Sequence, residues 1–303
     1  ETVILDGNTN GTLLFFRFLT GFFLAGIYPV GMKIATDYYQ KGLGTSLGFI
    51  VGALALGTAL PHLLKGSMHT ASWSTVLLSI SLLSAIGGAL LFLFVPDGPF
   101  RKKSSSMDLK VCFQLFKHAP FRKAAFGYFG HMWELYAFWT FVPILLKTYA
   151  DMHADIYFNI PLLSFLSIGI GGLSCVLGSA LAAKFGAQRV AFYSLVLSGT
   201  CCVLAPLLLS HSNALFFIVF LFFWGMVVIA DSPLFAALVA QNTPEKKRGT
   251  ALTIVNCIGF AITIISIQSL SMLYHSNGSH FIYWFLAIGP FFGVLALKSK
   301  KRR

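Results

Sequence analysis

The stretch of sequence that decides the fold reads ALFFIVFLFFWGMVVIADSPLFAALVAQNTPEKKRGTAL and covers residues 214–252. It joins a long apolar segment to a basic turn and then to a second apolar segment, and it places Gly225 eight residues before Pro233. At about 1.5 Å of rise per residue, residues 214–240 are long enough to cross about 30 Å of hydrocarbon. The stretch therefore predicts membrane-spanning helices, one of which bends at a proline.

The same pattern occurs a second time near the start of the chain. Gly21 lies eight residues before Pro29, and a Gly-Thr dipeptide follows at residues 44–45, as another does at residues 249–250 after the first stretch. Membrane proteins built from two halves with matching interrupted helices are typically secondary transporters. The repeat therefore predicts two related halves that move relative to each other.

The composition agrees with a membrane protein. Of 303 residues, 56% are hydrophobic and 11% are charged, and phenylalanine alone accounts for 31. These values lie far from those of soluble globular domains. The formal net charge of +12 would suit a nucleic-acid partner, but the basic residues gather in alternate loops without a recognition motif. We therefore expect a lipid bilayer and no nucleic acid around this chain.

We predict nine membrane-spanning segments, which make an all-α polytopic fold. They cover residues 12–36, 43–64, 74–95, 122–146, 159–182, 189–209, 214–240, 250–273 and 280–297. Lysine and arginine cluster after the third, fifth, seventh and ninth segments, whereas the intervening loops hold almost none. Because basic loops stay in the cytoplasm, we expect a cytoplasmic C-terminus and a multi-pass location in the cell (inner) membrane.

Residues 17–29, RFLTGFFLAGIYP, resemble the Arg-x-x-x-Gly stretch in the fourth helix of the major facilitator superfamily. The basic stretch 97–121 then resembles that family's central cytoplasmic loop, with a short interfacial helix near residues 107–117. The resemblance implies a two-half helical bundle whose N-terminal half is truncated, with three helices expected upstream. Residues 1–96 would be the remainder of that half, and residues 122–303 a complete six-helix C-terminal half with a basic tail.

Two motifs of the family are altered in this sequence. The loop before the sixth segment keeps Lys184, Gly186 and Arg189 but has Ala183 in place of the family's acidic residue. In the second segment, Ala53 takes the place of the proline in the antiporter signature, which disfavours an exporter.

The resemblance also implies residues that control the conformational change. Asp37, at the inner end of the first segment, looks like the partner of a loop arginine in the family. The full set of predicted gating residues consists of Pro29, Asp37, Lys184, Gly186, Arg189 and Pro233.

Three ionisable residues are expected inside the membrane: Arg17, Glu134 and Asp231. By helix rise, Glu134 lies roughly 18 Å and Asp231 roughly 15 Å from the cytoplasmic ends of their segments. Ionisable groups at such depth are costly and mark substrate or ion pathways. The resemblance places all three on helices that line the family's central cavity. For each of them, a structural contact between helices is the alternative.

Three further residues of the fourth segment extend this candidate pathway. His131 lies three residues before Glu134 and on the same helical face, so the two side chains could exchange a proton. Trp133 and Tyr136 are neighbours at helical spacing and could stack on a planar or apolar solute. The alternatives are a packing contact for His131 and ordinary core or lipid contacts for the aromatic pair.

Together these features predict a secondary active transporter of a small solute, a permease or symporter that works by rocker-switch alternating access with a proton as coupling ion. Arg17 favours an anionic or organic-acid solute, and a drug or amphiphile exporter is the alternative. A multi-pass enzyme is disfavoured because no His-x-x-x-His, Gly-x-Ser-x-Gly or phosphate-cradling motif occurs. A sensor without transport stays open. We expect a monomer with no cofactor and no metal.

Overall fold

The computed structural model describes residues 7–39, 42–67, 72–101, 114–153, 155–277 and 280–298. Within these ranges the chain is helical and has no strand. The α-helices are α1 Gly7–Tyr38, α2 Leu43–Ser67, α3 Trp73–Phe94, α5 Ala119–Met152, α6 Ile160–Phe185, α7 Ala187–Leu209, α8 Ala214–Val227, α9 Ser232–Gln241, α10 Arg248–Asn277 and α11 Ile288–Lys298. Two 3₁₀ helices, η1 Glu245–Lys247 and η2 His280–Ala287, precede α10 and α11. The predicted all-α polytopic fold is confirmed.

The described helices follow the nine predicted segments closely. Eight spans are long and apolar enough to cross a membrane, and α8 and α9 together form one of them, Ala214–Gln241. The remaining predicted segment is α5, which has 34 residues but is not among the eight. Many α5 side chains between Phe121 and Tyr149 are buried. A helix surrounded by protein can carry more polar side chains than one that faces lipid.

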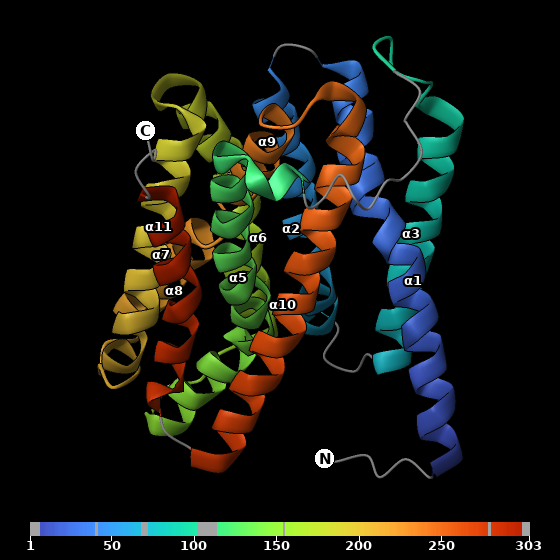
Figure 1. Cartoon of the computed structure of the whole chain (residues 1–303). Helices are drawn as coiled ribbons and strands as arrows, with labels where there is room; N and C mark the ends of the chain where they lie inside the picture. Colours follow the sequence, from blue (N-terminus) through green and yellow to red (C-terminus); the bar gives the residue numbers. More distant parts are fainter. Residues whose placement is uncertain are drawn as a thin grey trace.

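The helices form an up-and-down bundle with α5 near its centre (Figure 1). α1 begins at the lower end of the view, and α11 finishes at the upper end. α9, α10 and α11 all pack against α5. α1 and α3 stand at the right-hand edge, and the apolar windows of both helices are 0% buried.

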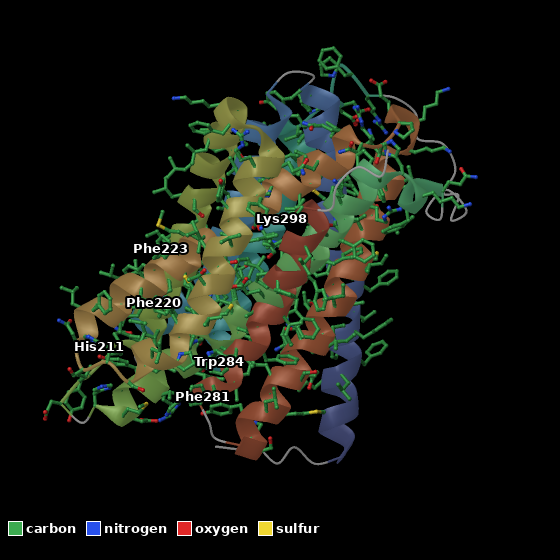
Figure 2. All side chains as sticks on the ribbon, turned by 60° about the vertical axis from the view of Figure 1, so that its left-hand side comes forward. His211, Phe220, Phe223, Phe281, Trp284 and Lys298 are labelled. Carbon is green, nitrogen blue, oxygen red and sulfur yellow. The ribbon has the colours of Figure 1, made fainter. Side chains whose placement is uncertain are left out.

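The outer surface of the C-terminal helices is rich in aromatic side chains. Phe223, Phe281 and Trp284 are 44%, 54% and 50% exposed, and Figure 2 shows them on the outside of the ribbon. Such a surface suits contact with lipid.

α2 and α6 are the main contact between the first three helices and the rest. A Cβ atom added to Gly52 would lie 2.7 Å from the carbonyl oxygen of Gly172, and one added to Gly172 would lie 2.9 Å from the carbonyl oxygen of Gly52. Gly48 lies equally close to Cys175 and Ser179. Only glycine lets two membrane helices approach so closely. The small residues of these two helices therefore serve packing.

Two sequence predictions lie beyond what the structure describes. Residues 107–113 of the predicted interfacial helix and residues 299–303 of the basic tail fall outside the described residues. The division of the chain at residues 96 and 121 stays a prediction.

Candidate functional site

The membrane span that contains Asp231 is broken, as its proline predicts. α8 ends at Val227, and α9 begins at Ser232. Pro233 has no N–H, so the carbonyl of Ile229 loses the hydrogen bond that it would make in a continuous helix. That carbonyl instead accepts the Ser232 N–H at 3.0 Å and the Cys175 thiol at 3.6 Å. The hydrogen-bonding needs of the Ile229 carbonyl at the break are therefore met by the neighbouring helix α6 and by the turn itself.

Small residues of α6 let that helix fit against the break. The Ser174 hydroxyl donates to the carbonyl of Met226 at 2.7 Å. A Cβ atom added to Gly178 would lie 2.7 Å from the carbonyl oxygen of Ala230, and one added to Gly171 would meet Ile229 at 2.6 Å. Membrane backbone outside a helix needs such protein partners because lipid offers no hydrogen bonds.

The break presents Asp231 to His131 on α5. The His131 Nδ1 atom lies 2.8 Å from the Asp231 Oδ1 atom, and both side chains are 1% exposed. In the described part of the chain, neither His131 Nε2 nor Asp231 Oδ1 has a partner at hydrogen-bonding geometry, so the pair is a close contact of two ionisable groups. The structure thus joins His131 to Asp231, whereas the sequence suggests exchange with Glu134. His131 and Glu134 lie one turn apart on α5 and yet reach different helices, which the spacing within one helix does not reveal.

Glu134 ties α5 to α7 and α8. Its Oε1 atom accepts the Trp224 Nε1–H at 2.7 Å and the Cys202 thiol at 3.2 Å, and its Oε2 atom accepts the Ser198 hydroxyl at 2.8 Å. The carboxyl is buried, with 1% of the residue exposed. Three donors from two other helices form the kind of interhelical contact that the sequence offers as the alternative for Glu134, and its place in a pathway stays a prediction. No sequence motif marks Ser198, Cys202 and Trp224 as partners of Glu134.

Trp133 and Tyr136, the aromatic pair predicted to stack on a solute, both make packing contacts within the protein. The Trp133 Nε1–H donates to the carbonyl of Phe285 at 3.1 Å, and the two rings lie 5.0 Å apart. Tyr136 packs edge-on against Trp139 and Phe260 at 5.1 and 5.5 Å. Neither Trp133 nor Tyr136 lies on the large cavity described below.

Sequence reasoning did not single out a second group of polar residues near the centre. The Tyr128 hydroxyl donates to the Asn256 Oδ1 atom at 2.8 Å between α5 and α10. Tyr28 of α1 and Tyr136 of α5 are partly buried and pack against both clusters of the core. Tyrosines in apolar runs resemble interface aromatics in the sequence, so only the fold reveals their convergence.

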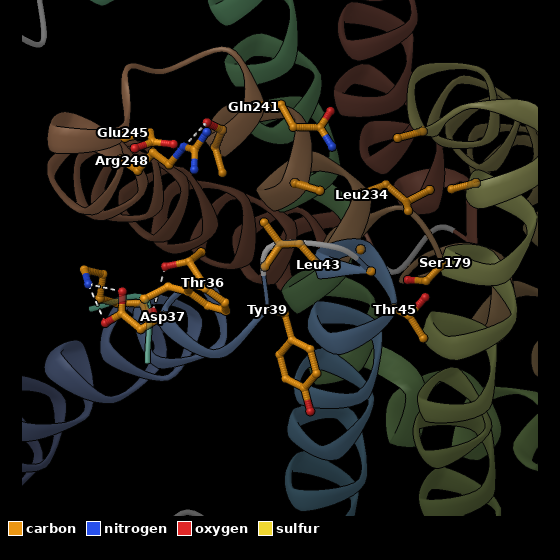
Figure 3. Close-up of a pocket in the computed structure, with 18 of the residues that line it drawn as sticks. Thr36, Asp37, Tyr39, Leu43, Thr45, Ser179, Leu234, Gln241, Glu245 and Arg248 are labelled. Carbon is orange, nitrogen blue, oxygen red and sulfur yellow. Dashed lines mark hydrogen bonds and ion pairs between the residues drawn. The ribbon is translucent and has the colours of Figure 1, made fainter. Parts of the chain in front are cut away.

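A cavity of about 680 Å³ lies at the end of the bundle where α1 and α9 finish and where α2, α7 and α10 begin (Figure 3). Its charged lining residues are Lys33, Asp37, Glu245, Lys246 and Arg248. Polar uncharged residues complete part of the wall, among them Thr36, Thr45, Ser179 and Gln241. The cavity is therefore mixed in charge and can hold a small polar solute.

Of the predicted gating residues, Asp37 is the one on this cavity. Its carboxylate pairs with Lys33 at 2.5 Å, one helical turn earlier. Lys184, Gly186 and Arg189 lie exposed at the α6–α7 turn, where Gly186 has a φ of +89°. Pro29 lies inside an unbroken α1.

Arg17 lies away from the other ionisable residues. Its side chain is exposed on α1, whose apolar window is 0% buried. Within the described residues, no acidic side chain pairs with it. The structure therefore brings His131 and Asp231 together, and it leaves Arg17 separate from both.

Comparison with known proteins places the chain in a family. The profile of the Major Facilitator Superfamily matches residues 2–267. The fold is similar to the crystal structure of a bacterial homologue of the iron transporter ferroportin in the outward-facing state. That match has a TM-score of 0.58 and 14% identity, and it covers 89% of this chain and 65% of that one. None of the functionally curated proteins compared with the chain matches it.

The chain belongs to the Major Facilitator Superfamily, a superfamily of membrane transporters. It is a multi-pass membrane protein, as the sequence predicts. This chain spans less than two thirds of the ferroportin homologue, and at 14% identity the likeness shows the fold alone.

Proposed function

We propose that this protein is a secondary active transporter of a small solute, with a proton as its coupling ion. The observation that carries this proposal is the His131–Asp231 pair, which is buried at a break in a membrane span. An imidazole beside a carboxylate can exchange a proton with it, and losing or gaining that proton changes the charge of a buried site. Such a change can favour one arrangement of the helices over another.

The second support is the position of the break, where helices from both parts of the chain meet. α8 packs against α6 and α7, and α9 packs against α5, α6, α7 and α10. α9 also packs against α2, which comes from the first part of the chain. A protonation change at Asp231 therefore acts where helices from both parts of the chain meet, which suits rocker-switch alternating access.

The membrane orientation follows from the basic loops. With the C-terminus in the cytoplasm, the 680 Å³ cavity opens on the cytoplasmic side, because α9 and α11 finish at the same end of the bundle (Figure 1). The basic loops are also the reason for placing the protein in the inner membrane, and we propose a monomer. The His131–Asp231 pair is the first candidate for the pathway. The other candidates are Arg17, Glu134, Trp133 and Tyr136.

The test is solute-driven proton movement in proteoliposomes that enclose a pH-sensitive dye. The purified protein is challenged in turn with small organic acids, sugars and amino acids, and uptake of a labelled form of each active solute is measured. We expect at least one solute to move protons and to lose its accumulation when a protonophore collapses the gradient. Absence of both signals across the set would contradict the transport proposal.

Two matched variants locate the coupling site. Asp231→Asn keeps the size of the side chain but cannot ionise, and we expect it to lower coupled flux about 100-fold, roughly 2.7 kcal/mol. Glu134→Gln keeps an acceptor for Trp224, and we expect it to lower protein stability more than coupling. If Glu134→Gln abolishes proton coupling and Asp231→Asn does not, Glu134 is the coupling residue.

A further inference from the structure

The inner end of the 680 Å³ cavity lies one helical turn from Asp231. The residues of α9 that line the cavity are Leu234, Ala237, Ala240 and Gln241. Leu234 is the deepest of them, because α9 runs from Asp231 toward the end of the bundle where the cavity lies. The Phe235 N–H donates to the carbonyl of Asp231 at 2.9 Å, so Asp231 and Leu234 share a helical turn with about 4.5 Å of rise between them. The cavity therefore leads toward the His131–Asp231 pair.

The lining of the cavity changes in character with depth. Its charged residues lie near the end of α1 and around the start of α10, and they are Lys33, Asp37, Glu245, Lys246 and Arg248. The α9 residues nearest to Asp231 are instead leucine and alanine. The wall is therefore charged at the mouth and apolar toward the pair, and an apolar constriction hinders the passage of water and ions.

Three apolar side chains close the space between the cavity and the pair. Met32 lies one turn deeper than Thr36 of α1, and Leu47 lies one turn deeper than Leu43 of α2 (Figure 3 shows Thr36, Leu43 and Leu234 on the cavity). Met32, Leu47 and Leu234 are 0%, 1% and 1% exposed and belong to one cluster of buried apolar side chains. α2 packs against both α1 and α9. We call these three side chains the apolar barrier.

The pair itself is closed off from solvent. The His131 and Asp231 side chains are each 1% exposed, and the Phe235 ring lies 6.0 Å from the His131 ring. A buried acid that gains and loses a coupling proton must exchange it with water. The cavity brings solvent to within about one helical turn of Asp231, and the apolar barrier stands between the two.

We infer that the cavity is the route by which the coupling proton reaches and leaves Asp231, and that the apolar barrier closes this route in the arrangement of helices seen here. The inference rests on the proposed proton-coupled transport and assigns a part in it to three residues outside the ionisable pair. A change in the packing of α2 against α9 separates Leu47 from Leu234 and admits water to Asp231. The barrier thus keeps protons from crossing without solute.

The experiment measures proton leak in proteoliposomes that enclose a pH-sensitive dye. A potassium diffusion potential set with valinomycin drives the protons, and no solute is added. Leu234→Ala shortens a side chain of the barrier, and we expect the leak to rise about tenfold over that of the parent protein. An unchanged leak in a folded Leu234→Ala protein would overturn the barrier.

Leu195→Ala is the matched control. Leu195 of α7 is also 1% exposed and belongs to the same cluster. A Cβ atom added to Gly293 of α11 would lie 2.9 Å from Leu195, which places this leucine against α11, and it is not among the residues that line the cavity. We expect its leak to stay within about twofold of the parent value. A leak as large as that of Leu234→Ala would indicate general loosening of the bundle and overturn the barrier.

Two further variants keep the test sharp. Leu47→Ala opens the barrier from α2, so we expect the same leak even if Leu234→Ala does not fold, and thermal unfolding in detergent shows which variants fold. Asp231→Asn is then added to a variant that leaks. We expect the double variant to return to the parent leak, because the route no longer holds a carboxylate. A leak that persists in the double variant would overturn passage through Asp231.

The outcomes separate this inference from transport itself. If a solute moves protons through the parent protein but neither Leu234→Ala nor Leu47→Ala leaks, the barrier is wrong and the transport proposal stands. If these variants leak through Asp231 but no solute moves protons, the barrier stands and the transport proposal fails.

Discussion

α1 and the α8–α9 span share a glycine eight residues before a proline, yet they differ in structure. α1 continues through Pro29 without interruption, and its apolar window is 0% buried. The α8–α9 span breaks just before Pro233, and its window is 39% buried. A Cβ atom on Gly21 would meet nothing within 4 Å, whereas one on Gly225 would collide with the carbonyl of Ser167.

The difference shows what a proline needs in order to break a membrane helix. Both prolines remove one N–H, but among the residues that the structure describes only the second span has a neighbour that supplies other donors, in Ser174 and Cys175 of α6. In lipid an opened helix without such donors would leave carbonyls unpaired. The break therefore depends on the donors of α6 as much as on the proline in the span itself.

The largest expected effect separates the two glycines. Gly225→Ala forces a methyl group against the Ser167 carbonyl, and we expect a loss of about 3 kcal/mol in the free energy of unfolding. Gly21→Ala has open space around it, and we expect no loss, or a gain below about 1 kcal/mol from helix propensity. Thermal unfolding in detergent measures both. Equal unfolding midpoints for the two variants would contradict the difference in packing between the two glycines.

The residues directly before these glycines give the next effect. Trp224→Phe leaves the Glu134 Oε1 atom without its 2.7 Å donor, and we expect a loss of about 2 kcal/mol. Thr20→Ala removes only a bond to Phe16 of the same exposed helix, and we expect less than about 0.5 kcal/mol. Unfolding midpoints should fall in that order. A stable Trp224→Phe protein would show that Glu134 does not depend on Trp224.

A smaller loss of stability is expected when α6 loses a hydrogen-bond donor to the break. Ser174→Ala leaves the Met226 carbonyl unpaired, and we expect a loss of about 1 kcal/mol. The control is Thr200→Ala, because Thr200 bonds only to Val196 of its own helix on an exposed face. Amide exchange near residues 226–230 should rise in Ser174→Ala and stay unchanged in the control. Unchanged exchange in both variants would mean that α6 does not hold the break.

The smallest loss is expected at Pro29. Pro29→Ala restores an N–H inside a helix that is already continuous, so stability should not fall. Solute uptake, measured as above, should stay within twofold of the parent protein. A large loss of uptake would indicate that Pro29 controls the conformational change in spite of the unbroken helix.

The positions of the spans could be predicted from the sequence, because hydropathy and helix rise are local properties. The interruption before Pro233 follows from the same reasoning, as does the burial of Glu134 and Asp231. In α1, however, the proline pattern did not predict a break correctly, since the surroundings of the helix decide the outcome.

The partners within the candidate site could not be predicted. His131 and Asp231 are 100 positions apart in the chain, and Glu134 reaches Ser198, Cys202 and Trp224 at separations of 64, 68 and 90 residues. No short-range pattern encodes such pairs. The cavity depends in turn on helix ends that meet only when the bundle is assembled.

The contact of Gly52 with Gly172 has a mechanical consequence. Because backbone meets backbone there, a change in the angle between α2 and α6 would move few side chains at this point. The contact is therefore suited to act as a pivot, with displacements that are smallest beside it and grow with distance along both helices. A tilt about it would change the width of the cavity, which lies toward one end of both helices.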